Sequence, residues 1–270
     1  MTTRIDSTAS IDPSAELGER VEVGRHAVVG AGVVVGDDCF IGAAAHIEGP
    51  TVLGRGNRIY PKAAVGFDPQ DLKWSGETVR LEVGEENVFR EFSTVHRGTP
   101  AGGGVTTIGS ENLFMVYTHV AHDCHVGSRT IFANNATLAG HVTVEDGATI
   151  GAFSAVHQFC RIGYEAYIGG FTILTKDALP YLKTVGQKPA CYGVNRIGLT
   201  RRGFSDERVG RLEAAARTLL RTGRNTTQAL ERLREEWPDD PDVARLIDFI
   251  VGSERGVIRT LPGSGRKRGG

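Results

Sequence analysis

Five of the eight histidines in this 270-residue chain fall between residues 119 and 157, beside several acidic and amide side chains. A neutral imidazole has a pKa of ~6.5, which suits a general base at neutral pH. Three imidazoles and one water molecule also form a catalytic zinc site. The pattern therefore predicts either proton transfer or metal binding, provided that the fold gathers these residues. They are His119, His122, His125, His141 and His157.

A six-residue period runs through most of the chain and predicts the scaffold that positions the histidines. From Ile11 to Val65 every sixth residue is aliphatic, and from Ile108 to Leu174 the same step meets only aliphatic or phenylalanine side chains. Many of these residues are followed four positions later by Ala, Ser, Thr or Cys. Neither the period of an α-helix nor that of a flat strand explains this pattern. It predicts a parallel β-helix, in which three hexads form one coil and coils stack ~4.8 Å apart.

A coil of three hexads contains 18 residues, so residues 18 apart in the sequence stack on one another. Gly140 lies one coil after His122, and Gln158 lies two coils after it. His141 and His157 are each one residue away from this stack. We therefore expect the three histidines to line one solvated corner of the β-helix.

This corner has the parts needed for acyl transfer. His122 is the candidate general base, and Asp123, which follows it directly, is the candidate partner that orients the imidazole. Gly140 has no side chain, so its backbone N–H is open to a developing oxyanion. Together these groups favour transfer of an acyl group to a hydroxyl or an amine.

Metal binding is the alternative chemistry for the same histidines. The γ-class carbonic anhydrases are β-helices that bind zinc through three histidines, two of which are five residues apart. In this chain His119, His122 and His125 are three residues apart, so neighbouring side chains diverge around the coil. We predict no metal and no cofactor. A γ-carbonic-anhydrase-like zinc enzyme and a structural solenoid without catalysis remain the alternatives.

Two insertions interrupt the repeat, and the repeat itself ends near residue 180. Loops that project from a rigid scaffold commonly carry binding residues. The predicted domains are the β-helix at 1–180 with insertions near 66–82 and 99–107, a connector and α-helical C-terminal domain at 181–262, and a disordered basic tail at 263–270.

Three helices are expected in the C-terminal domain, after an irregular connector. Ser205 is a plausible N-cap for the first helix and Gly223 its stop signal, while Asp239 or Asp240 precedes the last helix. The expected helices run from Ser205 to Arg221, from Thr226 to Glu236 and from Pro241 to Val251.

The composition excludes several classes of protein. The chain has 31 Lys or Arg and 32 Asp or Glu, a formal net charge of −1, so bulk electrostatics do not favour nucleic acid as a partner. No 18-residue apolar run predicts a membrane span, and the first residues lack the apolar segment of a secretory signal. Four cysteines without a CxxC pair indicate neither a disulfide scaffold nor a zinc ribbon. We expect a cytoplasmic protein.

Four segments together resemble the UDP-N-acetylglucosamine O-acyltransferases. They read HVAHDC, NNATLAGHV, AVHQF and QDLK, and the similarity extends from the first hexads through GVNRIGLTRRGFS to the helical tail. The resemblance implies a left-handed parallel β-helix that forms a homotrimer, with active sites between neighbouring chains. It also implies transfer of a 3-hydroxyacyl group from acyl carrier protein to the 3-hydroxyl of UDP-N-acetylglucosamine, the first step of lipid A biosynthesis, without a metal.

The resemblance assigns roles to individual residues. It gives His122 the role of general base, Asp123 that of its partner and the Gly140 N–H that of oxyanion donor. Gly170 matches the position that limits acyl-chain length, which implies a long chain. Ile197 departs from the acidic residue that relatives often carry there. The implied contacts to sugar, nucleotide or acyl chain are Asp71, Lys73, His119, His141, His157, Gln158, Asn195, Arg201 and Arg202.

The acceptor atom stays open at this point. N-acylation of a 3-amino sugar nucleotide, or of a glucosamine already acylated at oxygen, needs the same base and is not distinguished by these motifs. Arg201 and Arg202 form a dibasic pair suited to a diphosphate in either case.

Overall fold

In the computed structural model, which describes residues 2–220 and 225–262, each hexad folds into a short strand and a bend. The aliphatic residue of each strand points inward, and Ile41, Ile59 and Ile150 are fully buried. The bends contain residues in the left-handed region of backbone conformation, such as Asp123 at φ 58° and His141 at φ 61°. The buried stacks form the continuous core that the six-residue period predicts.

The strands form three sheets along the sides of a triangular prism. Sheet A contains β1 (Arg4–Ile5), β4 (Glu22–Val23), β7 (Phe40–Ile41), β10 (Arg58–Ile59), β13 (Val88–Phe89), β16 (Leu113–Phe114), β19 (Ile131–Phe132), β22 (Thr149–Ile150), β25 (Tyr167–Ile168), β27 (Leu182–Val185) and β28 (Ala190–Val194). Sheet B contains β2 (Ser10–Ile11), β5 (Val28–Val29), β8 (His46–Ile47), β11 (Ala64–Phe67), β14 (Thr94–His96), β17 (His119–Val120), β20 (Thr137–Leu138), β23 (Ala155–Val156) and β26 (Ile173–Leu174). Sheet C contains β3 (Glu16–Leu17), β6 (Val33–Val35), β9 (Thr51–Leu53), β12 (Arg80–Val83), β15 (Val105–Ile108), β18 (His125–Val126), β21 (Thr143–Val144) and β24 (Arg161–Ile162).

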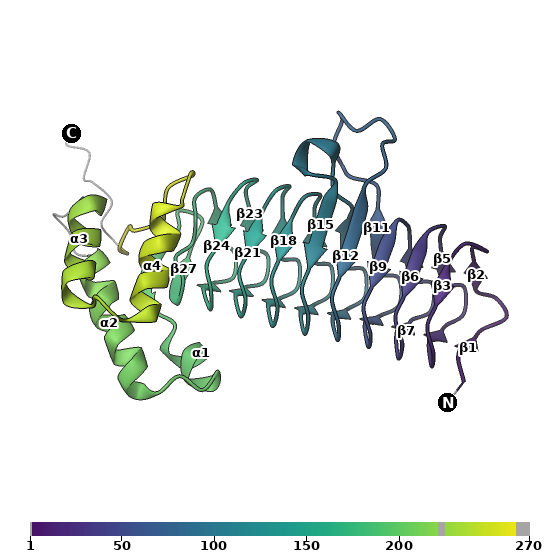
Figure 1. Cartoon of the computed structure of the whole chain (residues 1–270), viewed down its shortest axis with the longest axis horizontal. Coiled ribbons are helices and arrows are strands. Elements are labelled where there is room, and N and C mark those ends of the chain that lie inside the picture. The colour runs from purple at the N-terminus through teal and green to yellow at the C-terminus, as the bar shows by residue number, and fades with distance from the viewer. Residues whose placement is uncertain (1, 221–224, 263–270) are drawn as a thin grey trace.

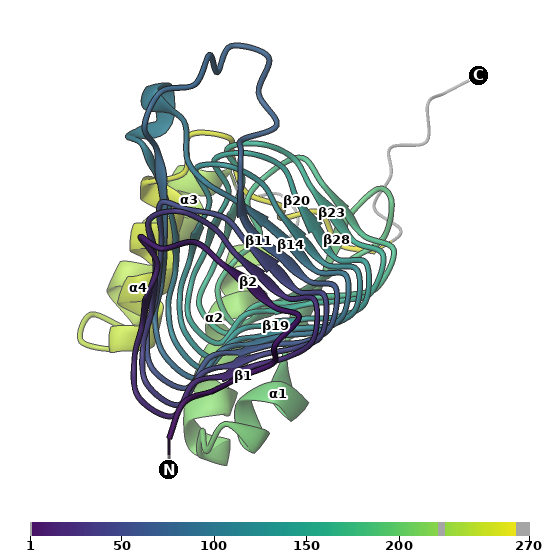
Figure 2. The ribbon, with the colours of Figure 1, turned by 90° about the vertical axis from the view of Figure 1, so that its right-hand side faces the viewer.

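The pairing is parallel throughout the coils, and among the strands in the described part of the chain only β27 and β28 pair antiparallel. Viewed from the amino-terminal end, the coil recedes anticlockwise, so the β-helix is left-handed (Figure 2). Crossover connections between parallel strands are right-handed in ~98% of cases, so this winding is the exception.

Both insertions leave the prism at the corner where sheet B meets sheet C (Figure 1). The first spans 68–79 and the second spans 97–104, which includes the short helix η1 (Pro100–Gly102), so both are shorter than expected. Arg97 fixes the base of the first insertion, because its guanidinium donates hydrogen bonds to the Asp68 carboxylate and the Gly49 carbonyl. The two loops therefore project beside one another over the same corner.

The C-terminal part differs from the sequence prediction between residues 181 and 201. In place of an irregular connector, β27 adds a further parallel strand to sheet A, β28 folds back on it, and α1 (Arg196–Arg201) follows. The next helices lie close to their predicted positions, namely α2 (Asp206–Leu220), α3 (Thr226–Glu236) and α4 (Pro241–Val251). The predicted Arg221 end and Gly223 stop, and the tail 263–270, lie outside the described residues.

The helices cover one end of the prism (Figure 1). Asp242 at the start of α4 is buried, and it accepts hydrogen bonds from the Tyr181 hydroxyl at 2.8 Å and from the Arg208 guanidinium at 2.5 and 2.7 Å. This network links the last coil to two helices. None of the helices in the described ranges has the length and hydropathy of a membrane-spanning segment.

Candidate active site

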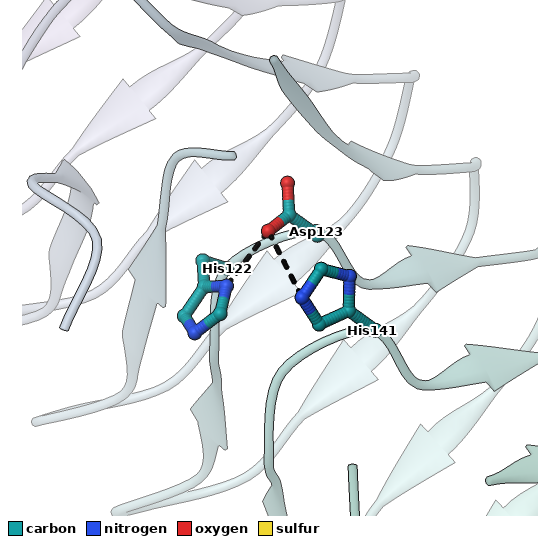
Figure 3. Close-up of side chains that lie close together, drawn as sticks. All are labelled: His122, Asp123 and His141. Carbon is teal, nitrogen blue, oxygen red and sulfur yellow. Dashed lines mark hydrogen bonds and ion pairs between the residues drawn. The ribbon is translucent and has the colours of Figure 1, made fainter. Parts of the chain in front are cut away.

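His122, Asp123 and His141 meet at the corner between sheets B and C (Figure 3). The Nδ1 atom of His122 lies 2.7 Å from Oδ2 of Asp123, and Nε2 of His141 lies 3.5 Å from the same oxygen. The two imidazole rings are perpendicular, with centroids 5.2 Å apart. The 18-residue repeat thus brings His122 and His141 together on successive coils.

The second insertion holds the carboxylate of Asp123 in place. The backbone N–H and the hydroxyl of Thr99 each donate a hydrogen bond of 2.7 Å to it, one to each oxygen. The Asp123 side chain is only 1% exposed, so no bulk water competes for these bonds. With Asp123 as acceptor, a neutral His122 carries its proton on Nδ1 and keeps the lone pair of Nε2 free. Sequence reasoning predicted this insertion but missed Thr99 within it.

Gly140 lies directly beneath the ring of His122. A Cβ atom placed on Gly140 would lie 2.6 Å from Cε1 and 2.8 Å from Nε2 of His122, closer than van der Waals contact permits. The backbone N–H of Gly140 makes no hydrogen bond within residues 2–220 and 225–262. A basic nitrogen and a free N–H donor therefore lie side by side, as transfer of an acyl group requires.

Two further imidazoles extend the row of histidines along sheet B. The rings of His96 and His119 are 5.3 Å apart, and Nδ1 of His119 lies 2.8 Å from the hydroxyl of Thr94. Burial, with smaller contributions from neighbouring imidazoles, lowers the pKa of each to about 4. Both rings are therefore neutral at pH 7. His96 was not among the residues predicted from the sequence, where its signal is its place just before the second insertion.

His141 is held in a fixed orientation by an aromatic neighbour. Its ring stacks on Phe159 with a centroid distance of 4.5 Å and an interplanar angle of 10°. Burial lowers the pKa of His141.

Cys124 is not a candidate nucleophile. Its buried thiol follows Asp123 in the sequence, and burial raises the pKa of this thiol to about 12, so the thiol is not ionised at neutral pH.

Four other residues predicted from the sequence also lie at this corner. Asp71 and Lys73 lie on the first insertion, where the Asp71 carboxylate accepts a 2.9 Å hydrogen bond from the Lys73 backbone N–H. His157 and Gln158 are exposed, and Nδ1 of His157 lies 3.1 Å from the Gln158 carbonyl oxygen.

The remaining predicted residues lie away from this corner. Asn195, Arg201 and Arg202 line a cavity of about 880 Å³ over sheet A, the side of the prism opposite the corner. The Arg202 guanidinium donates a 2.7 Å hydrogen bond to the Arg129 carbonyl. Exposed Gly170 lies at the corner between sheets A and B. One chain therefore does not bring all the predicted residues together.

Comparison with known proteins identifies the family. A family model described as UDP-N-acetylglucosamine O-acyltransferase, domain 2, matches residues 177–258. The chain is 48% identical over 197 residues to the acyl-[acyl-carrier-protein]–UDP-N-acetylglucosamine O-acyltransferase of Alkalilimnicola ehrlichii, covering 73% of this chain and 76% of the relative. The chain belongs to this O-acyltransferase family. A Stenotrophomonas maltophilia member is also 48% identical, over 76% of this chain and 79% of the relative.

Solved structures of the O-acyltransferase family have the same fold. The enzyme from Bacteroides fragilis superposes with a TM-score of 0.92 at 40% identity, covering 94% of this chain and 99% of that chain. The Francisella novicida enzyme gives a TM-score of 0.91 at 32% identity, covering 98% and 100%. These matches confirm the resemblance to the O-acyltransferase family and the expected left-handed β-helix with C-terminal helices.

Proposed function

We propose that this protein transfers a 3-hydroxyacyl group from acyl carrier protein to the 3-hydroxyl of UDP-N-acetylglucosamine, the first step of lipid A biosynthesis. One observation carries the proposal: in a chain of this family, Asp123 holds His122 against Gly140, whose N–H makes no hydrogen bond within the described residues. Four buried cysteines without a disulfide further support a reducing, cytoplasmic location.

The proposed reaction proceeds in two steps. Nε2 of His122 takes the proton of the acceptor hydroxyl while the hydroxyl oxygen attacks the thioester carbonyl, and the resulting oxyanion accepts a hydrogen bond from the Gly140 N–H. The tetrahedral intermediate then collapses, the carbon–sulfur bond breaks, and the imidazolium returns its proton to the departing thiolate. Asp123 stabilises the imidazolium between these steps. No covalent bond to the enzyme forms.

The neighbouring side chains suit the recognition of a sugar nucleotide. Neutral imidazoles, such as His119, offer one donor and one acceptor, which matches sugar hydroxyls. Asp71 and Lys73 on the first insertion add a charge of each sign near the sugar. We assign His141, His157 and Gln158 to contacts with the nucleotide or the acyl chain. A glycine at position 170 leaves room for a long acyl chain.

We infer that the active enzyme is a homotrimer. Aromatic rings stack along the corner between sheets A and B, with Phe92 4.9 Å from Tyr117 and Phe153 5.1 Å from Phe171. These four side chains are 39–64% exposed, which favours their burial against other copies of the chain. Threefold packing around this corner sets sheet A of one chain against sheet B of the next. Arg201 of one chain then approaches the His122 corner of its neighbour.

An assay of acyl donors and acceptors tests the proposed function. Acyl carrier protein thioesters of different chain lengths are offered with UDP-N-acetylglucosamine or its 3-amino analogue, and the products are identified by mass spectrometry. We expect a 3-O-acyl product and a preference for long 3-hydroxyacyl chains. Acylation of the amino analogue alone would refute O-acylation as the activity.

Replacement of Arg201 with alanine tests the nucleotide contact. Arg201 lines the cavity over sheet A, is exposed, and makes no ion pair within the described residues, so its charge is free for a phosphate. Loss of a charge-assisted hydrogen bond of about 1.5–3 kcal/mol raises the KM for the UDP-sugar about 10- to 100-fold, with a smaller change in kcat. Arg196, which lies in α1 with Arg201 and pairs with Glu213 of α2, supplies the control Arg196→Ala. An unchanged KM in Arg201→Ala would remove Arg201 from the site.

Mixed assemblies test whether sites form between chains. His122→Ala and Arg201→Ala are co-expressed with different tags, and assemblies carrying both tags are assayed at a low nucleotide concentration. If each site takes His122 from one chain and Arg201 from the next, about one site in three is intact in every trimer that carries both tags. We expect the activity of the mixed assemblies to exceed clearly that of either variant alone. Activity no greater than the average of the two would contradict the shared site.

A further inference from the structure

The side chains proposed to move the proton also form a ligand set for a transition-metal ion. His122, Asp123 and His141 each offer one donor atom, and these atoms all lie within 4.8 Å of one another. Two imidazole nitrogens and one carboxylate oxygen, with a fourth position open to water, form a common zinc ligand set. Divalent ions that prefer only oxygen ligands, such as Mg²⁺, are disfavoured here.

Two of the three distances between ligand atoms lie within about 0.8 Å of those around a tetrahedral ion, and the third, between the nitrogens of His122 and His141, is at most 4.8 Å. Zinc bonds of about 2.0–2.2 Å place neighbouring ligand atoms roughly 3.4 Å apart. Nε2 of His141 is already 3.5 Å from Oδ2 of Asp123. The hydrogen bond of 2.7 Å between His122 and Asp123 has to open by several tenths of an ångström as the ion replaces the proton between them.

The ligands are also held in place before any ion arrives. Both oxygens of Asp123 accept hydrogen bonds from Thr99, and the ring of His141 is clamped against Phe159. Such supporting contacts raise metal affinity because less freedom is lost on binding.

We propose that Zn²⁺ binds His122, Asp123 and His141 and inhibits the enzyme. The ion coordinates Nδ1 of His122, so the single proton of the neutral ring then lies on Nε2, which has no lone pair left to accept the proton of the acceptor hydroxyl. The ion also takes the carboxylate that would stabilise the imidazolium. The inhibitory consequence rests on the proposed function of this site. The binding of zinc does not depend on it.

Direct binding tests the site. Metal-free full-length protein is titrated with Zn²⁺ in a calorimeter, beside His141→Ala, the more conservative His141→Gln, and His125→Ala. His125 is the matched control, because it is exposed on sheet C and its Nδ1 lies 2.8 Å from the hydroxyl of Thr107. Circular dichroism verifies the fold of each variant.

We expect one Zn²⁺ per chain for the unaltered protein and for His125→Ala, and an affinity at least tenfold lower for both His141 variants. Mg²⁺ at the same concentration should produce no binding heat. Equal zinc affinity in the His141 variants, or no zinc binding by the unaltered protein, would overturn the proposal.

An activity measurement tests the inhibition separately. Zinc should inhibit formation of the acylated nucleotide by the unaltered enzyme and by His125→Ala, half-maximally near the measured Kd, and a chelator should restore the rate. An enzyme that binds zinc through His141 but keeps its full rate would overturn the inhibitory role. A protein that binds zinc in this way but never acylates the nucleotide would instead refute the proposed function.

Discussion

Replacement of His122 with alanine should lower kcat for acyl transfer by about 10²–10⁴-fold, the usual contribution of a general base. Without this imidazole, the nitrogen held 2.7 Å from Asp123 and the basic Nε2 beside Gly140 are both lost. The fold should survive, because the His122 side chain lies at a bend outside the buried core. Single-turnover rates with acyl carrier protein thioester measure the loss, and circular dichroism and the thermal unfolding midpoint verify the fold.

His125→Ala is the matched control for this prediction. His125 lies on the same coil, three residues further along, but on sheet C and away from Asp123. Its replacement should leave kcat within about twofold of the unaltered enzyme, since exposed substitutions outside a site have small effects. If His122→Ala retained more than about a hundredth of the activity, another group would have to be the base.

The repeat made much of the β-helix predictable from the sequence. A six-residue period is a local property, and it identifies inward residues such as Ile150 without knowledge of distant contacts. Because three hexads form one coil, the same period predicted that Gly140 stacks on His122. The short distance from the Gly140 position to the His122 ring agrees with this prediction.

Features outside the repeat were not predictable in the same way. Thr99 reaches Asp123 only because the second insertion folds back over the corner, and no periodic signal encodes the path of a loop. The strand β28 depends on an antiparallel pairing with β27 after the hexads have ended. The left-handed winding came from family resemblance, because the spacing of aliphatic residues is the same for either hand.

The separation of the candidate site over two faces has a related cause. An 18-residue stack predicts neighbours within the solenoid, whereas Arg201 follows a hairpin and lies in α1. Its place over sheet A depends on how the C-terminal part docks. Neither the sequence pattern nor a single chain reveals which neighbouring surface Arg201 faces, so the mixed-assembly experiment addresses the part of the site that the repeat leaves undetermined.

Gly140→Ala should reduce kcat at least 100-fold without unfolding the β-helix. The backbone at Gly140 does not adopt a positive φ, so alanine meets no conformational penalty there. The penalty is steric, because the new Cβ would lie 2.6 Å from Cε1 of His122 and the ring has to move. That movement disturbs the bond from His122 to Asp123, and the methyl group also obstructs approach to the Gly140 N–H.

The stability of the Gly140→Ala variant separates this effect from general damage. Overpacking at a partly open corner should cost no more than about 1–3 kcal/mol of unfolding free energy, which urea denaturation measures. Gly210→Ala is the control, because a Cβ at this position in α2 meets no atom within 4 Å. It should keep both activity and stability. A Gly140→Ala enzyme with an undiminished kcat would show that neither the position of the His122 ring nor access to this N–H limits the reaction.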